Sequence, residues 1–125
     1  MVTQLIPSTK HVDFQSILDY AALTNDYNPA HVDKDFANNS PMKGIIAHGT
    51  MSVALIWQAI KNTLGVEALN RIDLDIRFVR PVRIDDEVTG GGQLQTGSVD
   101  VFDVWVKNQK GEEVIVGTAV LLPSA

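Results

Sequence analysis

The alternation of apolar and polar residues divides the chain into a first half with two helices and a second half rich in strands. Residues 14–23 place apolar side chains at helical spacing, and Asp13 before them is a residue type favoured at helix N-caps. Residues 51–64 are apolar around most of a helical wheel, so we expect this longer helix to be surrounded by protein. Gly65 then supplies a natural helix stop.

A long polar stretch separates the two predicted helices. Residues 25–44 contain Asn, Asp, Pro and Gly throughout, which predicts a loop with one helical turn near residues 33–37. Loops of this length are uncommon in small domains, and those that occur are usually functional. We therefore expect this segment to contribute residues to a functional site.

The second half of the chain predicts an antiparallel sheet. In residues 72–79, apolar side chains alternate with side chains that are charged as far as Arg77, which is the period of a half-buried strand, and Pro81 marks the strand's end or a bulge. Extended segments are also predicted at residues 86–95, 99–107 and 113–122, and more weakly at 3–11. The glycine run 90–92 indicates a bulge or a close backbone crossing. The pattern predicts an α+β fold in which a sheet curls around one helix, with an uncovered edge and apolar face that favour a homodimer.

Composition limits the possible functions. A chain of 125 residues predicts a single domain over residues 1–125. The net charge of −5 and the absence of any Lys/Arg-rich stretch argue against a nucleic-acid partner. With no cysteine, disulfides, thiolate catalysis and Cys-based metal sites are excluded. We identify neither a signal peptide nor a membrane-spanning run, so we expect no membrane association and a cytoplasmic location.

Asp26 and His31 are the strongest candidates for catalysis. A carboxylate and a neutral imidazole that share one water molecule can draw a proton from it, which is the basis of general acid–base catalysis. Pro29 fixes one backbone dihedral between them and Asn28 can hydrogen-bond its own backbone, so both side chains could be held in place. The alternative is a turn in which Asp26 only caps a helix and His31 is only exposed.

His48 and Gly49 begin the longer predicted helix. A backbone N–H at a helix start is unpaired and lies at the positive end of the helix dipole, so Gly49 could stabilise a carbonyl oxygen that gains negative charge. Equally, Gly49 could be a simple N-cap and His48 a packing residue. His48 could also join Asp26 and His31 as metal ligands, but these spacings match no standard zinc pattern, and we expect no metal.

Three segments of the chain resemble a known family. Residues 20–31 read YAALTNDYNPAH, residues 44–49 read GIIAHG, and residues 78–88 read FVRPVRIDDEV. In this order they are similar to the (R)-specific enoyl-CoA hydratases, the MaoC-like dehydratases. The resemblance spans most of the chain and shifts the balance for Asp26 and His31 towards catalysis.

The resemblance implies a hot-dog fold, an antiparallel sheet wrapped around a long central helix, and a homodimer. It implies reversible addition of water to trans-2-enoyl thioesters, carried by CoA or by acyl carrier protein, without cofactor or metal. Asp26 and His31 match the catalytic pair that activates the water. The Gly49 amide matches the donor to the thioester carbonyl, and Asn28 and His48 match supporting positions.

Two positions depart from the family pattern, and two other functions remain open. The family commonly has Gly at the position of Asn25, although Asn also tolerates left-handed backbone dihedrals. Some members have a small hydroxyl residue in the central helix where Ala54 and Trp57 stand, so a Trp57 that faces the pocket would shorten it. A hot-dog thioesterase would need an acid on or beside this helix, and residues 51–64 contain none. A non-catalytic acyl-thioester-binding module would have lost Asp26 or His31.

Overall fold

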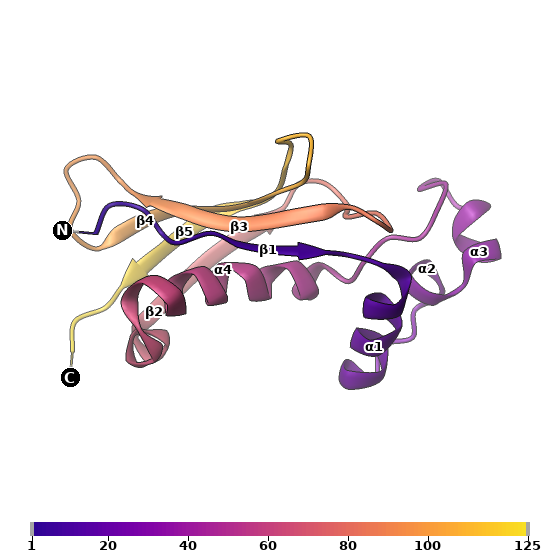
Figure 1. The fold of residues 1–125 in the computed structure, drawn as a ribbon, viewed down its shortest axis with the longest axis horizontal. Coiled ribbons are helices and arrows are strands. Elements are labelled where there is room, and N and C mark those ends of the chain that lie inside the picture. The colour runs from indigo at the N-terminus through magenta and orange to yellow at the C-terminus, as the bar shows by residue number, and fades with distance from the viewer. Residues whose placement is uncertain (1, 125) are drawn as a thin grey trace.

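A five-stranded antiparallel sheet with one long helix along one face forms the body of the protein (Figure 1). The computed structural model describes residues 2–124. The strand order is β1-β3-β4-β5-β2, and every pairing is antiparallel. The strands are β1 (Ser8–His11), β2 (Ile72–Phe78), β3 (Glu87–Leu94), β4 (Val101–Lys107) and β5 (Glu113–Leu121). The helices are α1 (Phe14–Thr24), α2 (Pro29–Val32), α3 (Lys34–Asn38), α4 (Gly49–Leu64) and the 3₁₀ helix η1 (Val66–Arg71).

The core lies between helix α4 and the sheet. Along β4, alternate residues are buried, because successive side chains of a strand point to opposite faces. The buried set on this strand is Phe102, Val104 and Val106. Helix α4 contributes Leu55, Ile56, Ala59 and Ile60, which recur at helical spacing on one side. The sheet and the helix thus bury one apolar face each, which confirms the predicted α+β arrangement.

Gly90 allows the helix to approach the sheet closely. A Cβ atom at Gly90 would lie 2.7 Å from the backbone carbonyl carbon of Leu55 on α4, so no other residue fits without moving the helix. The pairing of β3 with β4 continues through residues 90–92 without a change of register. Of the two interpretations of this glycine run, the close backbone crossing is therefore correct.

The N-terminal helix follows its sequence signals. The Asp13 carboxylate accepts a hydrogen bond from the Ser16 N–H at 2.7 Å, and this bond lowers the pKa of the Asp13 carboxyl. Helix α1 ends at Thr24, and its C-cap residue Asn25 has a left-handed φ of 55°. Asn tolerates this conformation better than most residues, so the turn is kept although Asn replaces the glycine that is common in the family.

The structure corrects the sequence prediction in two helical segments. Helix α2 lies within the segment predicted as a loop, although Asn28 followed by Pro29 is a typical N-cap and first-turn pair. The 3₁₀ helix η1 was also missed. The predicted turn near residues 33–37 is confirmed as α3. Strands β2 to β5 lie within the predicted ranges, and β1 forms only the end of the extended segment 3–11.

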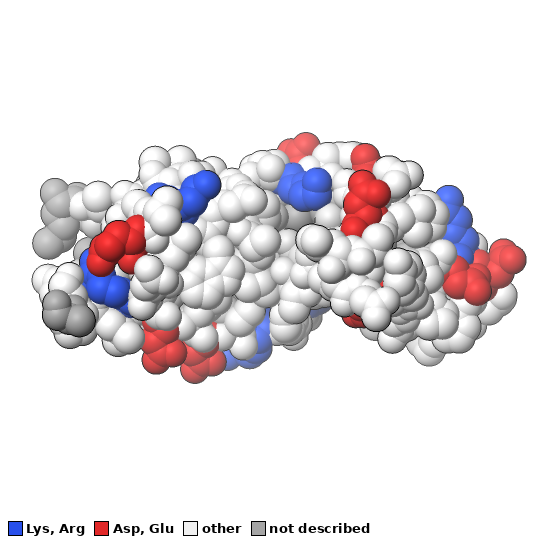
Figure 2. All heavy atoms as spheres, turned by 90° about the horizontal axis from the view of Figure 1, so that it is seen from below, with Lys and Arg blue, Asp and Glu red and all other residues white. Residues whose placement is uncertain are grey.

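The prediction that α4 is surrounded by protein is wrong for the single chain. Ala54 and Gln58 are exposed and Trp57 is half-buried, because one sheet covers only one side of a helix. Figure 2 shows the molecule from this side, with a broad uncharged area across the middle and charged side chains mainly around it. No helix in residues 2–124 is long and apolar enough to cross a membrane.

Candidate active site

The loop from α1 to α2 holds Asp26 in place through local hydrogen bonds. The Asp26 N–H donates to the Ala21 carbonyl at 3.0 Å, which continues the end of α1 around the left-handed Asn25. One carboxylate oxygen of Asp26 accepts from the Asn28 N–H at 3.2 Å. Asn28 in turn caps α2 by accepting from the Ala30 N–H at 3.0 Å. The supporting role predicted for Asn28 thus corresponds to a capped turn that fixes the start of α2.

His31 lies on α2 with one ring nitrogen held by the backbone. Its Nδ1 is 2.7 Å from the Ile46 carbonyl oxygen, and because a carbonyl only accepts, Nδ1 carries the proton. In the neutral ring, the lone pair is therefore on Nε2. The same segment is fixed by the Ile46 N–H, which donates to the Ala30 carbonyl at 3.2 Å. In this neutral form, the imidazole presents the unprotonated Nε2 in a fixed orientation, as a general base requires.

His48 is the N-cap residue of α4 and is almost fully buried, with 3% of its surface exposed. Its Nε2 donates to the Asp26 carbonyl oxygen at 2.9 Å, and its ring stacks on His31 with centroids 4.0 Å apart. The Tyr20 ring also packs edge-on against His48, with centroids 5.0 Å apart, and the Tyr20 hydroxyl donates to Thr50 Oγ1 at 2.7 Å. His48 therefore joins the Asp26 loop to α4.

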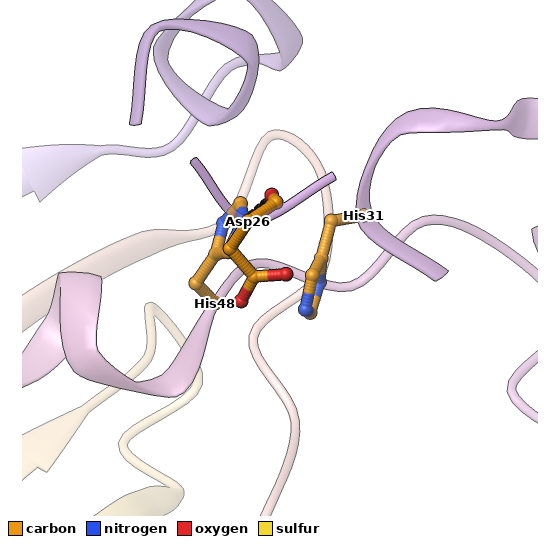
Figure 3. Close-up of side chains that lie close together, drawn as sticks. All are labelled: Asp26, His31 and His48. Carbon is orange, nitrogen blue, oxygen red and sulfur yellow. Dashed lines mark hydrogen bonds between the residues drawn. The ribbon is translucent and has the colours of Figure 1, made fainter. Parts of the chain in front are cut away.

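The fold brings Asp26, His31 and His48 into one cluster (Figure 3). Each side chain offers one oxygen or nitrogen atom that could bind a metal, and these three atoms lie within 4.8 Å of one another. Figure 3 shows the Asp26 carboxylate turned toward the His31 ring. Such a spacing could serve a divalent cation. However, the stacked rings of His31 and His48 are inclined by only 29°. The lone pairs in the two ring planes therefore run nearly parallel and do not converge well on one ion. The geometry favours acid–base chemistry, and a metal-free site stays a prediction.

A cavity of about 380 Å³ opens beside this cluster. His31 and Gly49 both contribute to its wall, and most of the remaining wall is apolar. The other lining residues are Met42, Ile46, Ala47, Ser52, Phe78, Val79, Arg80, Pro81, Val82, Val114 and Ile115. None of these described lining residues is an acid. The volume suits a small apolar group next to the His31 imidazole.

Gly49 is the first residue of α4, with His48 rather than Gly49 itself as the N-cap. Its N–H meets no acceptor within residues 2–124 and lies at the positive end of the helix. A Cβ atom at Gly49 would be 2.8 Å from Cε1 of Phe78, so the absence of a side chain leaves room for that ring beside the helix start. The structure therefore brings the predicted amide donor and the predicted base to one cavity.

Two residues of α4 complete the comparison with the sequence predictions. Trp57 is half-buried against the core and is absent from the described lining residues, so in the single chain it does not shorten the cavity. Ser52 was not predicted, yet it lines the cavity and is 2% exposed. Its position three residues after Gly49, on the same helical face, was the available signal.

Comparison with known proteins identifies the family. The MaoC like domain matches residues 3–117, which is most of the chain. The chain belongs to the MaoC-like domain family. It is 35% identical to an (R)-specific enoyl-CoA hydratase of Rhodospirillum rubrum, over 64% of this chain and 56% of that protein. It is 32% identical to a 3-hydroxybutyryl-CoA dehydratase of Methylorubrum extorquens, over 63% of this chain and 50% of that protein. The chain thus spans about half the length of these two relatives.

Solved structures confirm the hot-dog fold. The unliganded R-hydratase PhaJ1 from Pseudomonas aeruginosa matches all of this chain and 83% of its own, with a TM-score of 0.80 and 28% identity. An (R)-hydratase from A. caviae, described as involved in PHA biosynthesis, matches with a TM-score of 0.81 over 98% of this chain and 97% of its own. Because this second structure is only 24% identical in sequence, its similarity is evidence for the fold alone. The expected sheet around a long helix is therefore correct.

Proposed function

We propose that this protein is a hydro-lyase, an (R)-specific enoyl-CoA hydratase that adds water reversibly to trans-2-enoyl thioesters. The observation that carries the proposal is the Asp26 carboxylate close to His31, whose Nε2 is free, and a largely apolar cavity lined by both His31 and Gly49. The named activities of the two relatives supply the substrate class. CoA or acyl carrier protein carries the acyl group.

In the hydration direction, a water molecule binds between Asp26 and His31. One of its protons passes to this pair as its oxygen bonds to C3 of the substrate, and the C2=C3 electrons move toward the thioester carbonyl. C2 then takes a proton from the same pair, so that one water is added and both side chains return to their starting state. The dehydration direction reverses these steps.

The Gly49 N–H donates to the thioester carbonyl oxygen in this mechanism. That oxygen gains negative charge as C3 is attacked, so a fixed donor at the helix start stabilises the transition state more than the ground state. The acyl chain extends along the apolar wall next to the donor, which includes Ile46 and Val82.

A thioesterase is the main enzymatic alternative. Hydrolysis at the same carbonyl needs a carboxylate on or beside the central helix, and neither α4 nor the described cavity wall contains an acid. A binding module without turnover would not need Asp26 and His31 side by side. Both alternatives are therefore weaker than the hydratase on the residues present.

We also propose a homodimer and a cytoplasmic location. The exposed side of α4 carries Ala54 and Gln58, and β2 is a sheet edge that ends in the exposed Phe78. Figure 2 shows a broad uncharged area on this side of the molecule. A second copy that covers these surfaces would remove them from water. Light scattering after size exclusion tests this assembly, and a monomer at micromolar concentration would contradict it. The cytoplasmic location rests on the cysteine-free composition.

The activity is tested by following the loss of enoyl-thioester absorbance with crotonyl-CoA. Product stereochemistry and thiol release are measured in parallel, and we expect (R)-3-hydroxybutyryl-CoA without free thiol. The Asp35→Asn variant, which neutralises an exposed carboxylate on α3, serves as the control for Asp26→Asn. Thiol release would favour the thioesterase. No turnover with short and medium enoyl chains would contradict the hydratase.

A further inference from the structure

Ser52 is a buried hydroxyl without a hydrogen-bond partner in residues 2–124. The side chain is 2% exposed and belongs to a cavity wall that is otherwise largely apolar. A buried polar atom that has lost water without gaining a partner costs free energy, so such atoms are rare unless a ligand or function uses them. Ser52 is therefore a candidate for contact with a bound molecule.

Two other helical hydroxyls, those of Thr63 and Thr24, donate to backbone carbonyls of their own helices. Thr63, on the same helix, donates to the Ala59 carbonyl four residues earlier at 2.7 Å, and Thr24 donates to the Tyr20 carbonyl at 2.8 Å. This back-bonding is the usual solution for Ser and Thr inside helices. Ser52 makes no such bond, so its hydroxyl proton is free to donate elsewhere.

The helix geometry places this hydroxyl near the expected position of the thioester carbonyl. Side chains on an α-helix lean toward its N-terminus, so Ser52 Oγ lies over the turn that begins with Gly49. Both residues line the same cavity. A carbonyl oxygen has two lone pairs and can accept from two donors at once.

We propose that the Ser52 hydroxyl is a second donor to the thioester carbonyl oxygen, beside the Gly49 N–H. The inference rests on the proposed hydratase function and adds a catalytic residue to it. As negative charge develops on the carbonyl oxygen, the hydroxyl gains the partner that it lacks in the free protein. Ser52 then stabilises the transition state at the expense of the stability of the free protein.

The test uses Ser52→Ala, Ser52→Thr and the wild-type chain. For Ser52→Ala we expect kcat with crotonyl-CoA to fall about a hundredfold, as for the loss of one oxyanion-hole donor, with little change in KM. Its melting temperature should equal or exceed that of the wild type, because the unpaired hydroxyl is gone. Ser52→Thr keeps the hydroxyl and should recover most of the rate. The control Thr63→Val removes a satisfied hydroxyl from the same helix and should lower stability while leaving kcat unchanged.

A spectroscopic measurement separates this inference from the proposed function. In an Asp26→Asn background, bound crotonyl-CoA should show an absorbance shifted to longer wavelength by polarisation of its carbonyl, and adding Ser52→Ala should reduce the shift. A wild-type chain that shows the shift but no turnover would contradict the hydratase and leave the hydroxyl contact standing. An unchanged shift, absence of any shift, or a Ser52→Ala variant that is less stable yet fully active would overturn the contact.

Discussion

Substitution of Gly90 by Ala tests the close contact between sheet and helix that positions the site. The added Cβ would lie 2.7 Å from both the carbonyl carbon and the Cβ of Leu55, about 0.7 Å inside the 3.4 Å at which ordinary contact begins. Since one of these atoms is backbone, no side-chain rotation relieves the overlap. Either α4 moves away from the sheet or β3 bends.

The expected magnitude follows from that displacement. Overpacking a core costs about 1–3 kcal/mol, and a gap of about 0.5–1 Å forfeits a quarter to a half of each lost van der Waals contact. Because α4 packs along much of the sheet, we expect the upper end, about 3 kcal/mol of unfolding free energy, or a fall in Tm of roughly 10 °C. The displacement also moves Gly49, and a misplacement of about 1 Å can reduce turnover about a hundredfold.

Gly91→Ala is the matched control for this experiment. Its Cβ would face the opposite side of the sheet, 3.4 Å from Trp105 Nε1, where contact is ordinary. Replacing glycine there should leave the protein unchanged or stabilise it by about 0.4–1 kcal/mol, through the lower entropy of the unfolded chain. The assays are urea unfolding followed by circular dichroism and the rate of crotonyl-CoA hydration. Equal stability of the two variants would refute the argument from close approach.

Three further predictions concern the site and the first helix. Asp26→Asn keeps the turn acceptor and should lower kcat by about 10²–10⁴ with an unchanged melting temperature, whereas a near-normal rate would remove Asp26 from the mechanism. His48→Phe retains a ring beside His31 but loses the bond to the Asp26 carbonyl, so kcat should fall about tenfold with KM little changed, measured by steady-state kinetics. Asp13→Ala should lower Tm at neutral pH, because it removes the hydrogen bond from the Ser16 N–H that holds the pKa of the Asp13 carboxyl below its usual 3.8. This hydrogen bond stabilises the folded protein above pH 3.8, and the stabilisation disappears as the pH falls through the lower pKa of the folded state. Thermal melts at a series of pH values check the sign, and a deficit that does not shrink as the pH falls below 3.8 would contradict it.

Local signals in the sequence predicted most elements of the fold correctly. The alternation in residues 72–79 and the helical spacing in residues 51–64 follow directly from side-chain periodicity, which depends on the chain alone. The catalytic candidates Asp26 and His31 were also identifiable, because they lie within one short segment between two helices. Helix α2 was missed although Asn28 and Pro29 carry its start signal, since four residues are too few for periodicity.

Long-range packing decided what the sequence could not. Periodicity shows that α4 is apolar but not which side is covered, and only the sheet topology leaves Ala54 and Gln58 exposed in the single chain. The contact of His48 with the Asp26 loop spans 22 residues, and its geometry depends on how two helices meet.

The sequence by itself therefore determined the periodic elements, the family pattern and the types of chemical group available. Only the tertiary structure decided that the lone pair of His31 is on Nε2, that Trp57 lies outside the described cavity wall, and that the Ser52 hydroxyl has no partner. The physical reason is that hydrogen-bond partners and cavity walls come from segments distant in sequence. Periodicity, propensity and turn signals are local, so they specify each segment but not what it contacts.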